Sequence, residues 1–99
     1  MSGLLKCLLM SCFLSFCYTV GADPLQHTQL LAASCASCHG TNGHSAGGLP
    51  SLAGLSEQYF IEQMRQFKAG ERSSTIMSHH ASAYTDLEIK QLAEYFSDQ

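Results

Sequence analysis

The pentapeptide Cys35-Ala36-Ser37-Cys38-His39 constrains this chain more than any other feature of its sequence. In a helix, residues three positions apart lie on the same side of a turn, so the two thiols point in one direction. The histidine that follows adds an imidazole to the same turn. The spacing C-x-x-C-H is typical of covalent c-type haem attachment, with both thiols bonded to the porphyrin and the imidazole bound to iron. We therefore predict that Cys35 and Cys38 hold haem c and that His39 is an axial ligand.

Three other uses of paired cysteines remain open. A structural zinc site needs four ligands, yet no second C-x-x-C pair follows, and His79 and His80 are adjacent rather than three to five residues apart. A thioredoxin-like dithiol needs a βαβ context, and no strand-like run follows the cysteines. A structural disulfide suits an exported protein but leaves His39 unexplained. The complete motif favours haem.

The first 22 residues have the composition of an export signal. Lys6 provides a positive charge, residues 7–20 are mostly apolar, and Val20-Gly21-Ala22 resembles a cleavage site. The apolar run is shorter than the about 20 residues that a membrane-spanning helix needs. We expect a cleaved signal peptide of residues 1–22, a periplasmic domain of residues 23–99, and no membrane span after cleavage. An uncleaved anchor is the alternative.

The charge and size of residues 23–99 limit what this domain can be. It has eight acidic side chains against Arg65, Lys68, Arg72 and Lys90, a formal charge of −4. This negative charge disfavours nucleic acid and anionic membrane surfaces as partners. A domain this small buries little apolar surface and needs a cross-link or a cofactor. A covalently bound haem would supply the centre of its core.

Capping residues predict the first two helices. Asp23-Pro24 is a preferred helix start, and the helix should run to about Cys38. Ser56 and Gly70 should bound the second helix. Its apolar stripe is Phe60, Met64 and Phe67, so we interpret Met64 as a core residue rather than a ligand.

A capping box, Thr85 to Glu88, predicts a last helix that runs nearly to the end of the chain. Its apolar face consists of Ile89, Leu92, Ala93 and Phe96. We expect a glycine-rich loop at 40–54 and a second loop at 71–84 without helical period. Met77 lies in this second loop, where it could bring a thioether to a haem. No segment of residues 23–99 predicts a strand.

With these elements in place, the chain resembles the class I cytochromes c, a small all-α fold whose helices wrap around one covalently bound haem. In that family the first helix ends in C-x-x-C-H, and a later loop carries an axial methionine. The resemblance implies that Met77 is the sixth iron ligand and that the Pro50 carbonyl accepts a hydrogen bond from His39 Nδ1. It also implies that Leu52 packs on the haem and that Tyr95 lies where the last helix crosses the first.

A narrower resemblance is to the cytochrome subunit of flavocytochrome c sulfide dehydrogenase. It is carried by Phe67-Lys68-Ala69-Gly70-Glu71, Ser74-Thr75-Ile76-Met77, Ala83-Tyr84-Thr85-Asp86 and Ala93-Glu94-Tyr95-Phe96. The resemblance implies a non-catalytic subunit that takes electrons from the FAD of a flavoprotein during sulfide oxidation and passes them to a downstream acceptor. Ser78-His79-His80 departs from that family, which tends to have glycine and a basic residue there.

Two other functions remain open. A free soluble monohaem electron carrier of the periplasm would use the same site. A ligand-binding or peroxidatic haem domain would leave the sixth position open, with His79 or His80 as an acid–base group or alternative ligand. A stably docked subunit should expose an apolar patch near Ile76 and Tyr84.

Overall fold

The computed structural model describes residues 18–99, in which every regular element is a helix and no strand occurs. The elements are α2 (Pro24–His39), the 3₁₀ turn η1 (Thr41–Gly43), α3 (Glu57–Ala69), α4 (Met77–Ser82) and α5 (Asp86–Ser97). This confirms the all-α prediction. The expected signal peptide lies mainly outside the described residues, so its cleavage stays a prediction. Within residues 18–99, no helix has the length and apolar character needed to cross a membrane.

The three long helices begin at the predicted caps. The Asp23 carboxylate accepts a hydrogen bond from the Leu25 backbone N–H, and the Ser56 hydroxyl accepts one from that of Tyr59. Both hydrogen bonds of the capping box between Thr85 and Glu88 are present. These bonds satisfy backbone donors that a helix start otherwise leaves without a partner.

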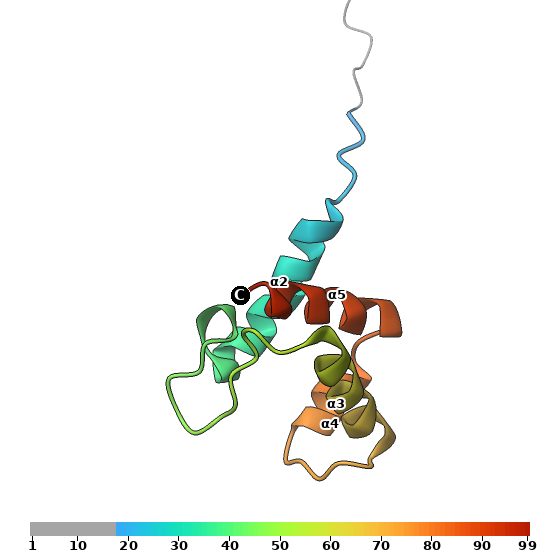
Figure 1. Ribbon diagram of the computed structural model, residues 1–99. Coiled ribbons are helices and arrows are strands. Elements are labelled where there is room, and N and C mark those ends of the chain that lie inside the picture. Colours follow the sequence, from blue (N-terminus) through green and yellow to red (C-terminus); the bar gives the residue numbers. More distant parts are fainter. Residues whose placement is uncertain (1–17) are drawn as a thin grey trace, which may run out of the picture.

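The core forms where α5 packs against both α2 and α3 (Figure 1). Its buried apolar residues are Ala32, Phe60, Met64, Ala81, Ile89, Leu92, Ala93 and Phe96. Phe60 of α3 stacks on Phe96 of α5, with ring centroids 5.8 Å apart. The predicted apolar face of α5 is therefore confirmed in full. In α3, Phe60 and Met64 are buried as predicted, whereas Phe67 is only half-buried.

The prediction of an unpatterned loop at 71–84 is wrong in part, because α4 forms within it. The Ser74 hydroxyl accepts a hydrogen bond from the Ser78 backbone N–H at 3.0 Å, which stabilises the first turn. Ala81 is completely buried and fixes the short helix against the core. Six residues are too few for an apolar period to be read, which is why the pattern missed the helix. Met77 is the first residue of α4.

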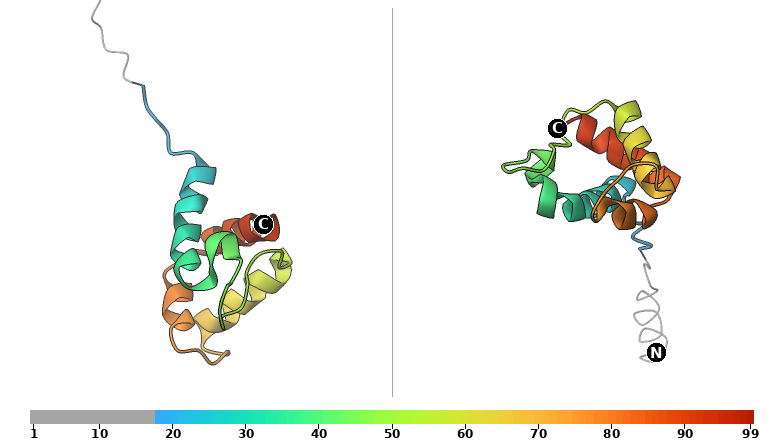
Figure 2. Two further views of the ribbon diagram at one scale, coloured as in Figure 1. Left: turned by 90° about the vertical axis from the view of Figure 1, so that its left-hand side faces the viewer. Right: turned by 90° about the horizontal axis from the view of Figure 1, so that it is seen from below.

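The loop between α2 and α3 is joined to α5 by backbone hydrogen bonds. The Gly43 carbonyl accepts from the Leu52 N–H at 2.8 Å, and the Gly54 N–H donates to the Phe96 carbonyl at 2.9 Å. In Figures 1 and 2 this loop (green) and the segment of α4 (orange) lie on different sides of the molecule. Helix α3 connects the two segments in the sequence. The space that these segments border contains the candidate site.

Candidate cofactor-binding site

A cavity of about 380 Å³ is bordered by the C-terminal end of α2, the loop at 49–55, α3 and the segment that leads into α4. This volume is in the range of small-molecule and cofactor sites. Cys35, Cys38, His39, Met77 and His80 all line it. The apolar part of the lining consists of Leu49, Pro50, Leu52, Leu55, Tyr59, Phe60, Met64, Phe67, Ile76 and Tyr84. The fold thus brings the predicted site residues together in a mainly apolar pocket.

The two cysteines lie on the last turns of α2 and are not joined in a disulfide. Cys35 is half-buried, and Cys38 is exposed. Burial raises the pKa of the Cys35 thiol above its usual value. Both sulfurs are therefore free for covalent attachment of a group in the cavity.

His39 is held by a single strong hydrogen bond. The ring is buried, and its Nδ1 lies 2.6 Å from the Pro50 carbonyl oxygen. Because a carbonyl can only accept, Nδ1 must carry the proton, and Nε2 of the neutral ring keeps its lone pair. This is the bond that the resemblance implies, and it prepares Nε2 to bind a metal.

The two methionines differ in their surroundings. Met64 is 5% exposed and belongs to the core, although one edge of it reaches the cavity. Met77 is half-buried at the start of α4. Of the two adjacent histidines, His80 lines the cavity and His79 does not.

Several cavity residues were not predicted from the sequence. Arg72 lines the pocket, and its guanidinium carbon lies 4.6 Å from the centre of the Phe67 ring. Tyr84 borders the cavity and connects its walls. Its hydroxyl lies 2.8 Å from Ser34 Oγ of α2, and its carbonyl accepts from Lys68 Nζ of α3 at 2.7 Å. No local pattern marks these residues, since each reaches the cavity through tertiary packing.

A second hollow, of about 480 Å³, lies where α2 and α5 cross, and no cysteine, histidine or methionine lines it among the residues that the structure describes. Tyr95 is part of its lining, in agreement with the position that the resemblance implies for this residue. The Tyr95 hydroxyl donates to Asn42 Oδ1 at 3.1 Å, and the ring packs edge-on against Phe96. The fully buried aromatic residue of α5 is Phe96. The predicted haem-binding residues Cys35, Cys38, His39 and Met77 all line the first cavity.

The donor set of the first cavity fits a covalently bound haem. Two free thiols line the same mainly apolar space as the imidazoles of His39 and His80 and the thioethers of Met64 and Met77. The sequence pattern of the cytochrome c family matches residues 28–98. The chain belongs to the cytochrome c family. Covalently bound haem c is thus its cofactor, and electron transfer is the role that this membership carries.

Two relatives from sulfur-related systems are similar in sequence to this cytochrome c. The cytochrome subunit of sulfide dehydrogenase from Chlorobaculum tepidum is 46% identical over 70 residues, which cover 71% of this chain and 64% of the relative. The thiosulfate dehydrogenase electron acceptor from Thiomonas intermedia is 44% identical over 68 residues, which cover 67% of this chain and 31% of the relative.

Cytochromes c4 form a second group of similar proteins. The one from Pseudomonas aeruginosa is 34% identical over 93 residues, which cover 86% of this chain and 46% of the relative. The Acidithiobacillus ferrooxidans cytochrome c4 structure superposes with a TM-score of 0.71 at 24% identity. That match covers 100% of this chain and 65% of the c4 chain, and it establishes the shared fold. This chain thus spans less than two thirds of the length of each of these relatives.

Proposed function

We propose that this protein is a periplasmic haem c electron carrier that accepts electrons from a flavoprotein partner during sulfide oxidation. The observation that carries the proposal is the 46% identity with a cytochrome subunit of sulfide dehydrogenase. The cavity supports it, because the two thiols, the hydrogen-bonded imidazole of His39 and the thioether of Met77 line one space. The proposal includes export with cleavage after Ala22, so the protein isolated from the periplasm should begin at Asp23.

This proposal assigns a role in haem binding to five residues of the cavity. Cys35 and Cys38 would hold the haem through thioether bonds, and His39 Nε2 and the Met77 sulfur would bind its iron. The Pro50 carbonyl keeps the proton on His39 Nδ1, at the observed 2.6 Å. When bound, haem c supplies one-electron chemistry at iron, and ligation by methionine and histidine raises its reduction potential.

The apolar walls serve electron transfer rather than bond chemistry. Leu52 and Leu55 are half-buried in the lining, and Phe60 and Met64 connect the lining to the buried core. Such walls exclude water, so the polar surroundings rearrange little when the charge of the site changes. With His39 and Met77 both bound to the iron, no position would be left there for a substrate.

The single C-x-x-C-H motif in the sequence limits this chain to one haem and one electron in each cycle. A reduced flavin donor carries two electrons. It must therefore deliver them in two separate steps, to two molecules of this cytochrome or to one that is reoxidised between them.

Exposed apolar side chains at the rim of the cavity favour a docked partner. Leu49, Tyr59 and Ile76 line the cavity and remain 50%, 51% and 55% exposed. Tyr84 is less exposed than expected, since it is half-buried with its hydroxyl beside Ser34. A cluster of exposed apolar residues beside the cofactor fits a stable protein interface.

A free soluble monohaem carrier is the second candidate. The similarity to a thiosulfate dehydrogenase electron acceptor and to cytochromes c4 favours this alternative. The negative formal charge of the domain also permits fast, salt-dependent encounters with a basic partner.

Gel filtration of the native protein at low and high salt separates the two candidates, with absorbance followed for haem and flavin. A docked subunit should elute with flavin at both salt concentrations, because apolar contacts are screened little by salt. Ile76→Ser should release the flavoprotein. Leu87→Ser is the matched control, since Leu87 is 65% exposed but does not line the cavity. Elution of haem alone at the monomer position, with no reduction by any flavoprotein, would favour the free carrier.

A further inference from the structure

We propose that the Tyr84 hydroxyl holds the segment that carries Met77 against α2 and thereby keeps the Met77 sulfur on the haem iron. The inference rests on the proposed placement of haem and on Met77 as an iron ligand. It gives a positioning role to a residue that lies beyond the end of α4.

The residues proposed to hold the haem come from two separate parts of the fold. Cys35, Cys38 and His39 belong to α2, whereas Met77 is the first residue of α4. Helix α4 packs against α3. Because two covalent bonds would fix the haem to α2, a ligand on α4 stays within reach of the iron only if α4 keeps its distance from α2. A contact that sets this distance therefore belongs to the site.

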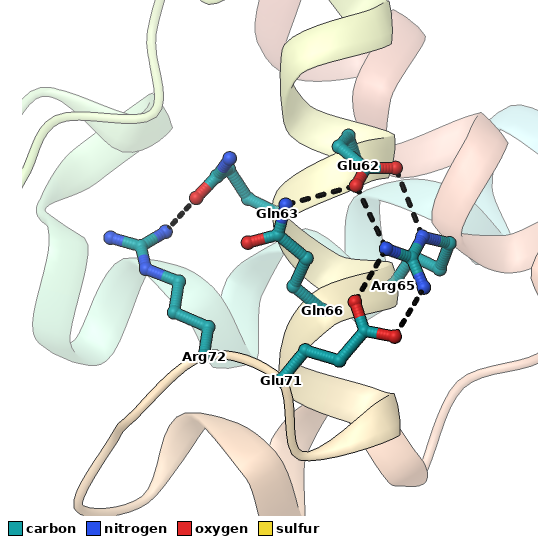
Figure 3. Close-up of polar contacts among 6 residues, drawn as sticks. All are labelled: Glu62, Gln63, Arg65, Gln66, Glu71 and Arg72. Carbon is teal, nitrogen blue, oxygen red and sulfur yellow. Dashed lines mark hydrogen bonds and ion pairs between the residues drawn. The ribbon is translucent and has the colours of Figure 1, made fainter.

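At its start, the segment between α3 and α5 is tied to α3. The Glu71 carboxylate accepts a hydrogen bond from Arg65 Nη2 at 2.7 Å, and Arg72 Nη1 donates one to Gln63 Oε1 (Figure 3). Both contacts lead back to α3, so neither of them fixes the segment relative to α2.

At its end, the same segment is tied to α2 by Tyr84. The Tyr84 hydroxyl lies 2.8 Å from Ser34 Oγ. Ser34 donates its own hydroxyl proton to the Leu31 carbonyl at 2.7 Å, so Tyr84 must donate to Ser34. Within residues 18–99, this is the hydrogen bond that joins residues 71–84 to α2. It forms beside Cys35, the first of the two cysteines expected to hold the haem.

Tyr84 is also connected firmly to α4 and α3. Its backbone N–H donates to the carbonyl of Ala81, the completely buried residue of α4, at 3.4 Å. Its carbonyl accepts a hydrogen bond from Lys68 Nζ of α3 at 2.7 Å, and its side chain packs against the core. Loss of the hydroxyl would leave these contacts in place and remove only the hydrogen bond to α2.

This arrangement links the Tyr84 hydrogen bond to the accessibility of the iron. In our proposal, Met77 leaves the iron when its segment moves away from α2, and the bond between Tyr84 and Ser34 breaks in the same step. The apparent affinity for an external ligand is the intrinsic affinity multiplied by the fraction of molecules in that open state. Removing the bond should therefore raise the apparent affinity, although no iron ligand is changed.

The test is a titration of the isolated ferric haem-loaded protein with imidazole, followed by loss of the far-red absorption band of methionine ligation. In Tyr84→Phe, the apparent association constant should rise about fivefold. This corresponds to about 1 kcal/mol, the usual net contribution of one hydrogen bond. Ser34→Ala should give a similar rise. Because both side chains take part in one bond, the double variant should exceed either single variant by less than about twofold.

Tyr95→Phe is the matched control. It also removes a hydroxyl that donates to a side chain, in this case Asn42 Oδ1 at 3.1 Å, but Tyr95 does not line the cavity. Tyr95→Phe should lower the midpoint of guanidinium unfolding about as much as Tyr84→Phe does. It should change the imidazole affinity less than about twofold.

A wild-type imidazole affinity in Tyr84→Phe, or an equal rise in Tyr95→Phe, would overturn the proposal, because the Tyr84 bond would then stabilise only the fold as a whole. Additive effects of Ser34→Ala and Tyr84→Phe would refute the shared bond. Should Ser34→Ala not acquire haem, Tyr84→Phe and its control decide. A ferric wild-type protein without the far-red band would refute ligation by Met77 together with the proposal. No electron donor takes part in these measurements, so they are independent of the identity of the partner.

Discussion

Gly43 is a position where a single methyl group should disturb the packing of the loop against α5. It has a left-handed backbone with φ of 78° and lies in the loop that leads to Leu52. A Cβ atom at this position would lie 2.8 Å from Phe96 Cδ1, 2.9 Å from the Ala53 backbone nitrogen and 3.0 Å from Leu52 Cβ. Two of these atoms belong to loop residues, and the third to the fully buried ring of α5. None of them is the end of a flexible side chain.

The cost of Gly43→Ala has two parts. A residue with a Cβ atom in the left-handed region costs roughly 1–2 kcal/mol. Overpacking beside a buried ring adds about 1–3 kcal/mol. We therefore expect the free energy of unfolding to fall by about 2–5 kcal/mol, a large share of the roughly 5–15 kcal/mol that is usual for a domain.

Substitutions at two other glycines distinguish the backbone contribution from the overpacking contribution. Gly54 has φ of 73°, but a Cβ atom added to it would have no neighbour within 4 Å, so Gly54→Ala should cost only the backbone part. Gly48 has neither a left-handed φ nor a neighbour within 4 Å, so Gly48→Ala should stay within about 0.5 kcal/mol of wild type. Guanidinium unfolding of the haem-loaded protein, followed by far-ultraviolet circular dichroism, measures all three. If Gly43→Ala is no less stable than Gly54→Ala, the close contact with Phe96 does not constrain the loop.

Three further predictions concern the site and the charges. Met77→Ala should remove the signature of thioether ligation from the ferric visible spectrum. Met64→Ala should keep that signature and lower the free energy of unfolding by about 2–5 kcal/mol. The opposite pattern would make Met64 the iron ligand and Met77 the core residue. Acid–organic extraction should leave haem on the wild type, and replacing Cys35 and Cys38 by Ser should abolish incorporation and leave an apoprotein largely unfolded by circular dichroism. Hydrogen bonds from Arg65 lower the pKa of Glu62 from 4.5 to about 2, so this carboxylate stabilises the fold above pH 4.5 and ceases to do so as the pH falls to about 2. The Tm difference between wild type and Glu62→Gln should shrink over that range, and a constant difference would contradict the assignment.

Local signals were sufficient for most of the fold. Asp23, Ser56 and Thr85 cap helices through bonds to backbone atoms two or three residues away, so a short stretch of sequence contains both partners. The apolar face of α5 follows from the helical period alone. The attachment motif is also local, and it identified the wall of the cavity that α2 contributes.

Tertiary contacts explain what the sequence did not reveal. The short helix α4 packs against α3, and its Ala81 is a small residue that is completely buried in the core. Phe67 continues an apolar stripe, yet it borders the cavity and carries the guanidinium of Arg72 on its ring.

The packing of α5 on α2 also has a consequence for the order of events in biosynthesis. A polypeptide is made from its N-terminus, so Cys35 and Cys38 leave the ribosome well before Asp86–Ser97, the helix that completes the core. The loop hydrogen bond from Gly54 to Phe96 likewise has no acceptor until the chain is almost finished. The attachment motif thus precedes the helix that completes the core, and in the exported chain the two thiols would be accessible until that helix packs on α2.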